Sequence, residues 1–155
     1  MRNVFIISLF AFCSQFSFSQ TVCGVKEVET MVQKSVANSK EQDAKNEAKY
    51  QKALDELGKV KKWTESQKAT YGLKLMGSKE IAVCEDNKKK LANDIMTLMM
   101  QADDKKETEN NCKVIKQAED VFNQMLEQNS NEWKIALDMI SADYKATTKK
   151  ELVIE

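Results

Sequence analysis

The side chains of this chain that could do chemistry are its cysteines and its many carboxylates. Its 155 residues contain four cysteines and no histidine. Without histidine there is no Ser-His-Asp triad, no Cys-His dyad and no metal or haem held by imidazole. The cysteines are scattered without a Cys-x-x-Cys pair, which excludes an ordinary structural zinc site. We therefore expect no catalytic residue, no metal site and no cofactor.

Two further patterns could indicate an enzyme. Adjacent acidic residues, such as Glu85–Asp86 and Glu119–Asp120, can perform acid–base catalysis as in glycosidases. On lysine-rich helices such pairs more often form solvated faces. The segment from Gly72 to Lys79 spaces two glycines as a phosphate-binding loop does, but Ser78 precedes Lys79 where that motif needs the reverse order. We interpret these patterns as helix faces and a helix break, so the chain is predicted not to be an enzyme.

Residues 1–19 differ from the rest and predict a cleaved secretory signal peptide. They contain Arg2, an apolar run from Val4 to Phe12, and small residues at Ser17 and Ser19. The run is too short to cross a bilayer as a helix, which needs about 20 apolar residues. The alternative is a buried N-terminal helix. We expect a secreted or periplasmic protein with one domain over residues 20–155.

The charge of the remaining chain excludes some partners. From Gln20 onward it keeps 23 lysines, no arginine and 24 acidic residues, a net charge near −1. Nucleic acids and anionic membranes call for a basic patch, which this balance does not favour. We expect neither nucleic acid binding nor stable membrane insertion after cleavage of the signal.

The elements that must position the reactive side chains are helices. The chain has no proline and only four glycines, and strong helix formers dominate it. Helices are predicted over residues 24–57, 64–76, 78–101, 104–128 and 131–150. Between Ala37 and Lys49 alanine is the only apolar residue, so this part of the first helix is expected to be mobile or to project from the body.

Local signals set the predicted boundaries. Thr64 with Gln67 forms a capping box, and Asp104 with Glu107 gives the next capping signal. Gly58 and the turn Asn129-Ser130-Asn131 are the predicted stops. Long helices with short connections imply antiparallel neighbours. The predicted fold is an all-α, elongated antiparallel bundle of three to four long helices with coiled-coil-like packing.

The helix over residues 78–101 carries the clearest apolar period. Alternating spacings of three and four residues give a coiled-coil-like seam with one polar lapse, formed by Ile81, Cys84, Lys88, Leu91, Ile95, Leu98 and Ala102. Methionines and tryptophans extend this apolar character. We consider a possible apolar interaction surface made of Met96, Met99, Met100, Met125, Trp133 and Met139. Filling of a loose core is the alternative reading of the methionines. The tryptophans, Trp63 and Trp133, are expected to anchor the bundle ends.

Helix geometry also bears on the disulfide. An exported protein meets an oxidising compartment, and three cysteines remain after cleavage of the signal. A hairpin turning near residue 103 places Cys84 about 28 Å and Cys112 about 14 Å from the turn, so a bridge between them is disfavoured. Cys23–Cys112 is the favoured pair, with Cys84 free and buried or an alternative partner.

Function remains a set of hypotheses. The leading one is a secreted, non-enzymatic helical interaction protein that binds another protein or self-associates through its apolar helix seams. The alternatives are a carrier of a small apolar ligand and an exported inhibitor of an extracellular hydrolase. The last rests on Ser66–Tyr71 followed by Cys84, which resembles helical periplasmic lysozyme inhibitors but lacks the repeated cysteine pairs of that family. We assign no family on this basis.

Overall fold

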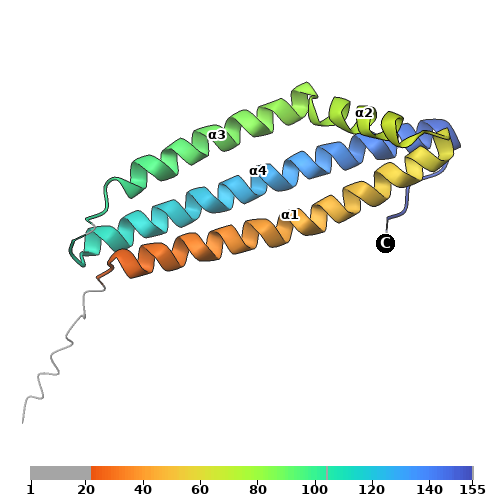
Figure 1. Ribbon diagram of the computed structural model, residues 1–155. Coiled ribbons are helices and arrows are strands. Elements are labelled where there is room, and N and C mark those ends of the chain that lie inside the picture. Colours follow the sequence, from red (N-terminus) through yellow and green to blue (C-terminus); the bar gives the residue numbers. More distant parts are fainter. Residues whose placement is uncertain (1–21, 104, 155) are drawn as a thin grey trace, which may run out of the picture.

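The computed structural model describes residues 22–103 and 105–154, and its named elements are all helices (Figure 1). They are α1 (Val25–Lys61), α2 (Glu65–Met76), α3 (Lys79–Met99) and α4 (Glu109–Thr148). Within the described ranges, extended pairing is confined to one isolated antiparallel bridge between Cys23 and Thr108. The all-α prediction is thus confirmed. The predicted signal peptide lies outside the described residues.

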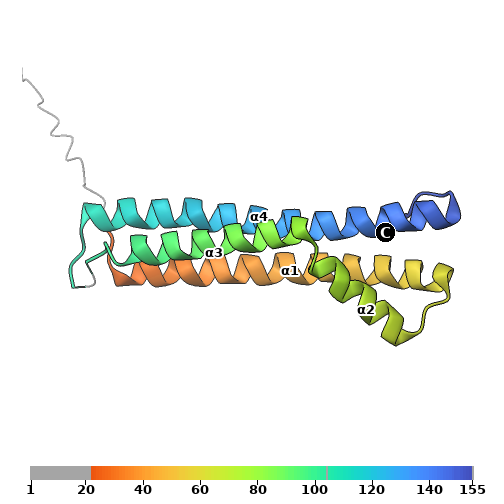
Figure 2. The same ribbon diagram turned by 90° about the horizontal axis from the view of Figure 1, so that it is seen from above.

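The helices form an elongated bundle (Figure 2), and α4 contacts both α1 and α3 and lies between them in the view of Figure 1. α2 and α3 together return along the rod, antiparallel to α1 and α4. Because this return path uses two helices, α1 and α4 run in the same direction and pack side by side as parallel neighbours. α4 packs against all three other helices, whereas the backbones of α1 and α3 do not come into contact. In the described part of the chain, no helix is both long and apolar enough to cross a membrane.

Side-chain caps begin three of the helices. The Thr64 hydroxyl accepts a hydrogen bond from the backbone amide of Gln67 at 3.2 Å. The side-chain oxygen of Gln67 accepts one from the backbone amide of Thr64 at 2.8 Å, which confirms the predicted capping box. Ser78 caps α3. Thr108 caps α4, because its hydroxyl accepts a hydrogen bond from the backbone amide of Asn111 at 3.0 Å. The predicted start at residue 104 is therefore wrong, and the helix begins at Glu109.

Two other predicted breaks are also wrong. α1 continues through Gly58 to Lys61 and ends where Lys62 adopts the left-handed conformation, with φ of 55°. α4 continues without interruption through Asn129-Ser130-Asn131, so the two helices predicted over 104–128 and 131–150 are one helix of 40 residues. The side-chain amide of Asn129 donates a hydrogen bond to Asp43 of α1, so at least this polar residue is paired with a neighbouring helix while the segment stays helical.

The apolar core consists of two clusters separated along the rod. The α2-end cluster contains the buried residues Tyr50, Ala53, Leu54, Leu57, Leu75, Ile81, Ala136 and Ile140. The disulfide-end cluster contains the buried residues Met31, Ile115 and Ala118, with Leu98, Met99 and Phe122 packed against them. The stretch of α1 from Ala37 to Lys49 lies between the two clusters. It is helical, and its contacts with α4 show that it does not project from the body.

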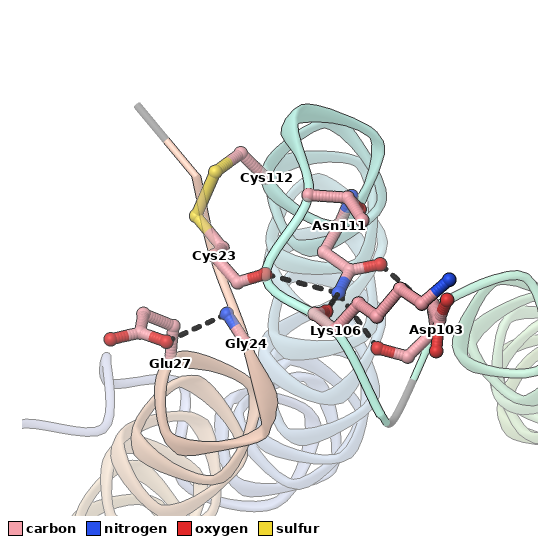
Figure 3. Close-up of a disulfide and its surroundings, with 8 residues drawn as sticks. Cys23, Gly24, Glu27, Asp103, Lys106, Asn111 and Cys112 are labelled. Carbon is pink, nitrogen blue, oxygen red and sulfur yellow. Dashed lines mark hydrogen bonds between the residues drawn. A yellow bond between two sulfur atoms is a disulfide. The ribbon is translucent and has the colours of Figure 1, made fainter. Parts of the chain in front are cut away.

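A disulfide and a buried amide fasten the disulfide end (Figure 3). Cys23 and Cys112 are bridged, with an S–S distance of 2.06 Å and Cα atoms 5.1 Å apart, as the helix geometry favoured. Beside the bridge, the Asn111 side chain is 1% exposed and donates to the backbone carbonyl oxygens of Cys23, Asp103 and Lys106. This end therefore ties the start of α1 to the loop before α4.

Candidate functional site

The candidate site is an open groove between α1 and α3, with α4 as its floor, which we call the middle groove. It encloses about 430 Å³. Its apolar surface comes from Phe122, Met125 and Leu126 of α4 and from Val36 of α1, which is 43% exposed. A volume of this size is within the range of small-molecule sites, about 300–1,000 Å³.

The groove opens because α1 lacks large apolar side chains at this level. On either side of it, large side chains fill the bundle: Met31 with Leu98 at the disulfide end, and Tyr50 with Ile81 at the α2 end. Between them α1 presents only Ser35, Val36, Ser39 and Lys40 to the groove. Small and polar side chains cannot bridge from α1 to α3, so the apolar residues of α4 stay open to solvent.

A carboxylate of α1 ties the middle of that helix to α4. Asp43 Oδ1 accepts hydrogen bonds from the Asn129 amide and, at 3.4 Å, from the Trp133 indole N–H. The Ser39 hydroxyl donates to Asp43 Oδ2 at 3.5 Å. Trp133 also packs edge-on against Tyr50, with ring centroids 5.6 Å apart. Polar contacts therefore replace apolar packing between α1 and α4 at the groove.

A charged network of Lys88, Glu85 and Glu132 links α3 to α4 beside the groove. Lys88 Nζ lies 2.5 Å from Glu132 Oε2 and 2.6 Å from Glu85 Oε1. Glu132 is only 5% exposed, and this burial raises the pKa of its carboxyl above the ordinary value although Lys88 opposes the shift. Burial lowers the pKa of Lys88, but its hydrogen bonds to the two carboxylates outweigh that effect, so the pKa lies above its ordinary value.

The residues of the expected apolar interaction surface do not come together. Met125 lines the middle groove, while Met139 packs at the α2-end cluster, 14 residues or about 21 Å further along α4. Met99 packs on the disulfide-end cluster, and Met96 and Met100 are exposed by 62% and 81%.

Trp133 lies within α4 beside Asp43, so its expected place at a bundle end is wrong. The side chains of Trp63 and Tyr71 pack against each other near the α1–α2 connection.

The seam of α3 faces inward. Ile81 and Cys84 are buried, with exposures of 1% and 6%, and Cys84 is a free thiol. Lys88, the polar lapse in the seam, is the residue that reaches Glu132. α4 packs along α3, and the seam residues Leu91, Ile95 and Leu98 are partly buried.

Sequence reasoning missed most of the groove, namely Ser35, Val36, Ser39, Lys40, Phe122, Leu126 and Asn129. One signal could have found it. The alanine-only stretch of α1 had to lie against some part of another helix, and Phe122, Met125 and Leu126 are the apolar residues that it leaves uncovered. The missing information was the pairing of α1 with α4 and its register.

Among the described residues, no group of three or more acidic or cysteine side chains is placed to hold a metal ion. The carboxylates nearest the groove are engaged in the hydrogen bonds and ion pairs described above. Comparison with known proteins finds no matching family model, no matching curated protein and no matching solved structure.

Proposed function

We propose that this chain is an exported, non-enzymatic binding protein that holds the apolar part of a small ligand in the middle groove. The observation that carries this proposal is the partly exposed apolar floor of Phe122, Met125 and Leu126 between the two clusters. Apolar surface left open in a concave site is the usual mark of a ligand or partner site.

Two observations support export. The N-terminal sequence has the pattern of a secretory signal. The disulfide between Cys23 and Cys112 is of a kind that persists in oxidising compartments.

The burial of the seam favours a small ligand over self-association. Self-association through the seam was expected, because an apolar stripe that is not packed within the molecule can be buried against a second chain. α4 packs along that stripe and its Ile81–Cys84 end is buried, whereas the middle groove remains open. The groove floor from Phe122 to Asn129 is about 10 Å long. That length is about two helical turns, which is enough for a small molecule and is the shortest stretch over which a docked helix places its apolar anchors.

A neutral apolar dye tests the proposal. We expect N-phenylnaphthylamine to bind the purified, disulfide-bonded protein saturably with one site per chain, seen as enhanced dye fluorescence. Val36→Trp fills the groove and should weaken binding at least tenfold. Val60→Trp is the matched control, because Val60 is a 37% exposed valine of the same helix outside the groove. Absence of saturable binding, or equal weakening by both variants, would refute the proposal.

A protein partner is the second candidate, favoured by Met96 and Met100. These two exposed methionines lie at and just beyond the end of α3, and exposed methionine suits adaptable protein contacts. Native mass measured at several concentrations tests self-association there. A dimer that Met96→Gln and Met100→Gln abolish would support it, and a monomer at all concentrations would exclude self-association through these residues.

A further inference from the structure

The middle groove is polar at one end and apolar at the other. Along α4 the floor begins at Phe122, continues through Met125 and Leu126, and ends at Asn129. Lys88, which lines the groove from α3, reaches Glu132 beyond Asn129. Lys40 lies four residues after Val36 on α1. A ligand that matches this gradient has an apolar tail toward Phe122 and a polar head toward the two lysines.

The two lysines at the polar end differ in how they are paired. Lys88 has a side chain only 20% exposed and contacts both Glu132 and Glu85. Lys40 is exposed and makes no salt bridge with any residue that the structure describes. The polar end thus presents Lys40, which has no ion-pair partner among the described residues, and Lys88, one of whose partners is the solvent-exposed carboxylate of Glu85.

Glu85 is the partner that a ligand can replace. Its side chain is 45% exposed, whereas that of Glu132 is 7% exposed and fixed against α4. Glu85 is the more exposed of the two carboxylates on Lys88, so water can solvate it when it turns away. A carboxylate from a ligand would then take its position, and Lys88 would again have two carboxylate partners.

Resting on the proposed function, we propose that the ligand is a single-chain carboxylate, such as a fatty acid. Its tail lies on Phe122, Met125 and Leu126, and its head takes the place of Glu85 at Lys88, with Lys40 beside it. Asp43 is the other acidic group near the groove, and it already accepts three hydrogen bonds from Ser39, Asn129 and Trp133. The head therefore belongs on the lysine side of the groove.

Calorimetric titration with decanoate and with decanol, its uncharged counterpart, tests the proposal. We expect decanoate to bind at least tenfold more tightly than decanol. Lys40→Gln should weaken decanoate binding several-fold and leave decanol binding unchanged. Glu85→Gln removes the competing carboxylate and should tighten decanoate binding about fivefold, again without effect on decanol.

Glu56→Gln is the matched control for Glu85→Gln. Glu56 also pairs with a lysine three residues away and is 44% exposed, but its partner, Lys59, does not line the middle groove, whereas Lys88 does. Unchanged decanoate binding in Glu85→Gln, or equal tightening in Glu56→Gln, would overturn the carboxylate head. Equal affinities for decanoate and decanol would also overturn it, while leaving the proposed apolar site intact. Failure of decanoate, decanol and the neutral dye to bind would overturn both proposals.

Discussion

The side-chain amide of Asn111 donates a hydrogen bond to the backbone carbonyl oxygen of Cys23, 3.0 Å away and 88 residues earlier in the chain. The next residue, Cys112, is disulfide-bonded to the same Cys23. Asn111 also accepts a hydrogen bond from the Asp103 amide at 2.9 Å. One buried side chain therefore holds the start of α1 and the loop before α4 against the covalent bridge (Figure 3).

Replacement of Asn111 by alanine should destabilise the protein by about 2–3 kcal/mol, because it removes the hydrogen bonds of a buried side chain to the backbone of Cys23, Asp103 and Lys106. Urea unfolding with the disulfide intact measures the loss. Asn110→Ala is the matched control, since this exposed neighbour makes only one long bond, 3.4 Å to the Gln101 carbonyl. We expect it to change stability by less than about 0.5 kcal/mol. Similar losses in the two variants would contradict the role of Asn111.

The buried ion pair of Lys88 and Glu132 gives a second prediction. Lys88→Met leaves Glu132 buried without a cation and should cost about 3 kcal/mol at neutral pH. The double variant Lys88→Met with Glu132→Leu should recover most of this loss, because it removes both charges together. Lys89→Met is the control: Lys89 is 73% exposed in its pair with Asp86, and its loss should cost less than about 0.5 kcal/mol.

The Lys88→Met variant should also be less destabilised at acid pH. Burial already raises the pKa of Glu132, and removal of the lysine that opposes this shift raises it further. The folded state then binds a proton that the unfolded state has released, so stability falls as pH rises from the unfolded value, about 4.3, through the folded one. Unfolding measured at pH 5 and pH 8 should show the larger loss at pH 8. An equal loss at both values would mean that Glu132 is not the group left unpaired.

Tyr71 makes stability sensitive to alkali. Its hydroxyl donates to Asp143 Oδ2 at 2.7 Å, and burial together with this carboxylate raises the pKa of Tyr71 well above its ordinary value. Above about pH 10 the unfolded chain loses this proton while the folded protein keeps it, so stability decreases as pH rises. Burial also raises the pKa of Tyr50, which acts in the same direction.

Tyr71→Phe should therefore lower the melting temperature slightly at pH 7 but reduce its further decline between pH 9 and pH 11. Circular dichroism melts across this range test the expectation. Asp143→Asn should reduce the decline partly, and Asp138→Asn, which removes an exposed carboxylate from the same helix, should not alter it. A Tyr71→Phe profile parallel to that of the original protein would contradict the assignment.

Local sequence signals were sufficient for the helical class and for some boundaries. Thr64 and Gln67 specify a helix start within four residues, and the structure forms both hydrogen bonds of that capping box. Helix lengths also favoured the Cys23–Cys112 pairing that the structure forms. These features depend on residues close in sequence or on the fixed rise of a helix.

Features that depend on contacts between helices could not be predicted in this way. Asn129-Ser130-Asn131 has the composition of a turn, but it stays helical where Asn129 meets Asp43. The middle groove results from the register of α1 on α4, which places Ser35 and Ser39 beside Phe122 and Met125. The sequence pattern of either helix alone does not determine how the two helices align along each other.

The C-terminal segment shows the same dependence on tertiary contacts and gives the last prediction. Leu152 and Ile154 pack against the α2-end cluster. Lys149 adopts a left-handed conformation with φ of 62°, which ends α4, and the chain then returns beside α1 (Figure 1). An ion pair between Lys145 and Glu151 accompanies this turn. The C-terminal segment therefore covers apolar surface of the α2-end cluster that the helices leave open.

Leu152→Ala and Ile154→Ala should each cost about 1–2 kcal/mol, less than for a fully buried residue because both side chains are only half-buried. Val153 lies between them and is 77% exposed, so Val153→Ala is the matched control and should cost less than about 0.5 kcal/mol. Urea unfolding measures the three variants. If Val153→Ala were as costly as its neighbours, or if all three were neutral, the segment would not be packed on the cluster. A graded loss confined to Leu152 and Ile154 would show that alternate residues of this short tail contribute to the core.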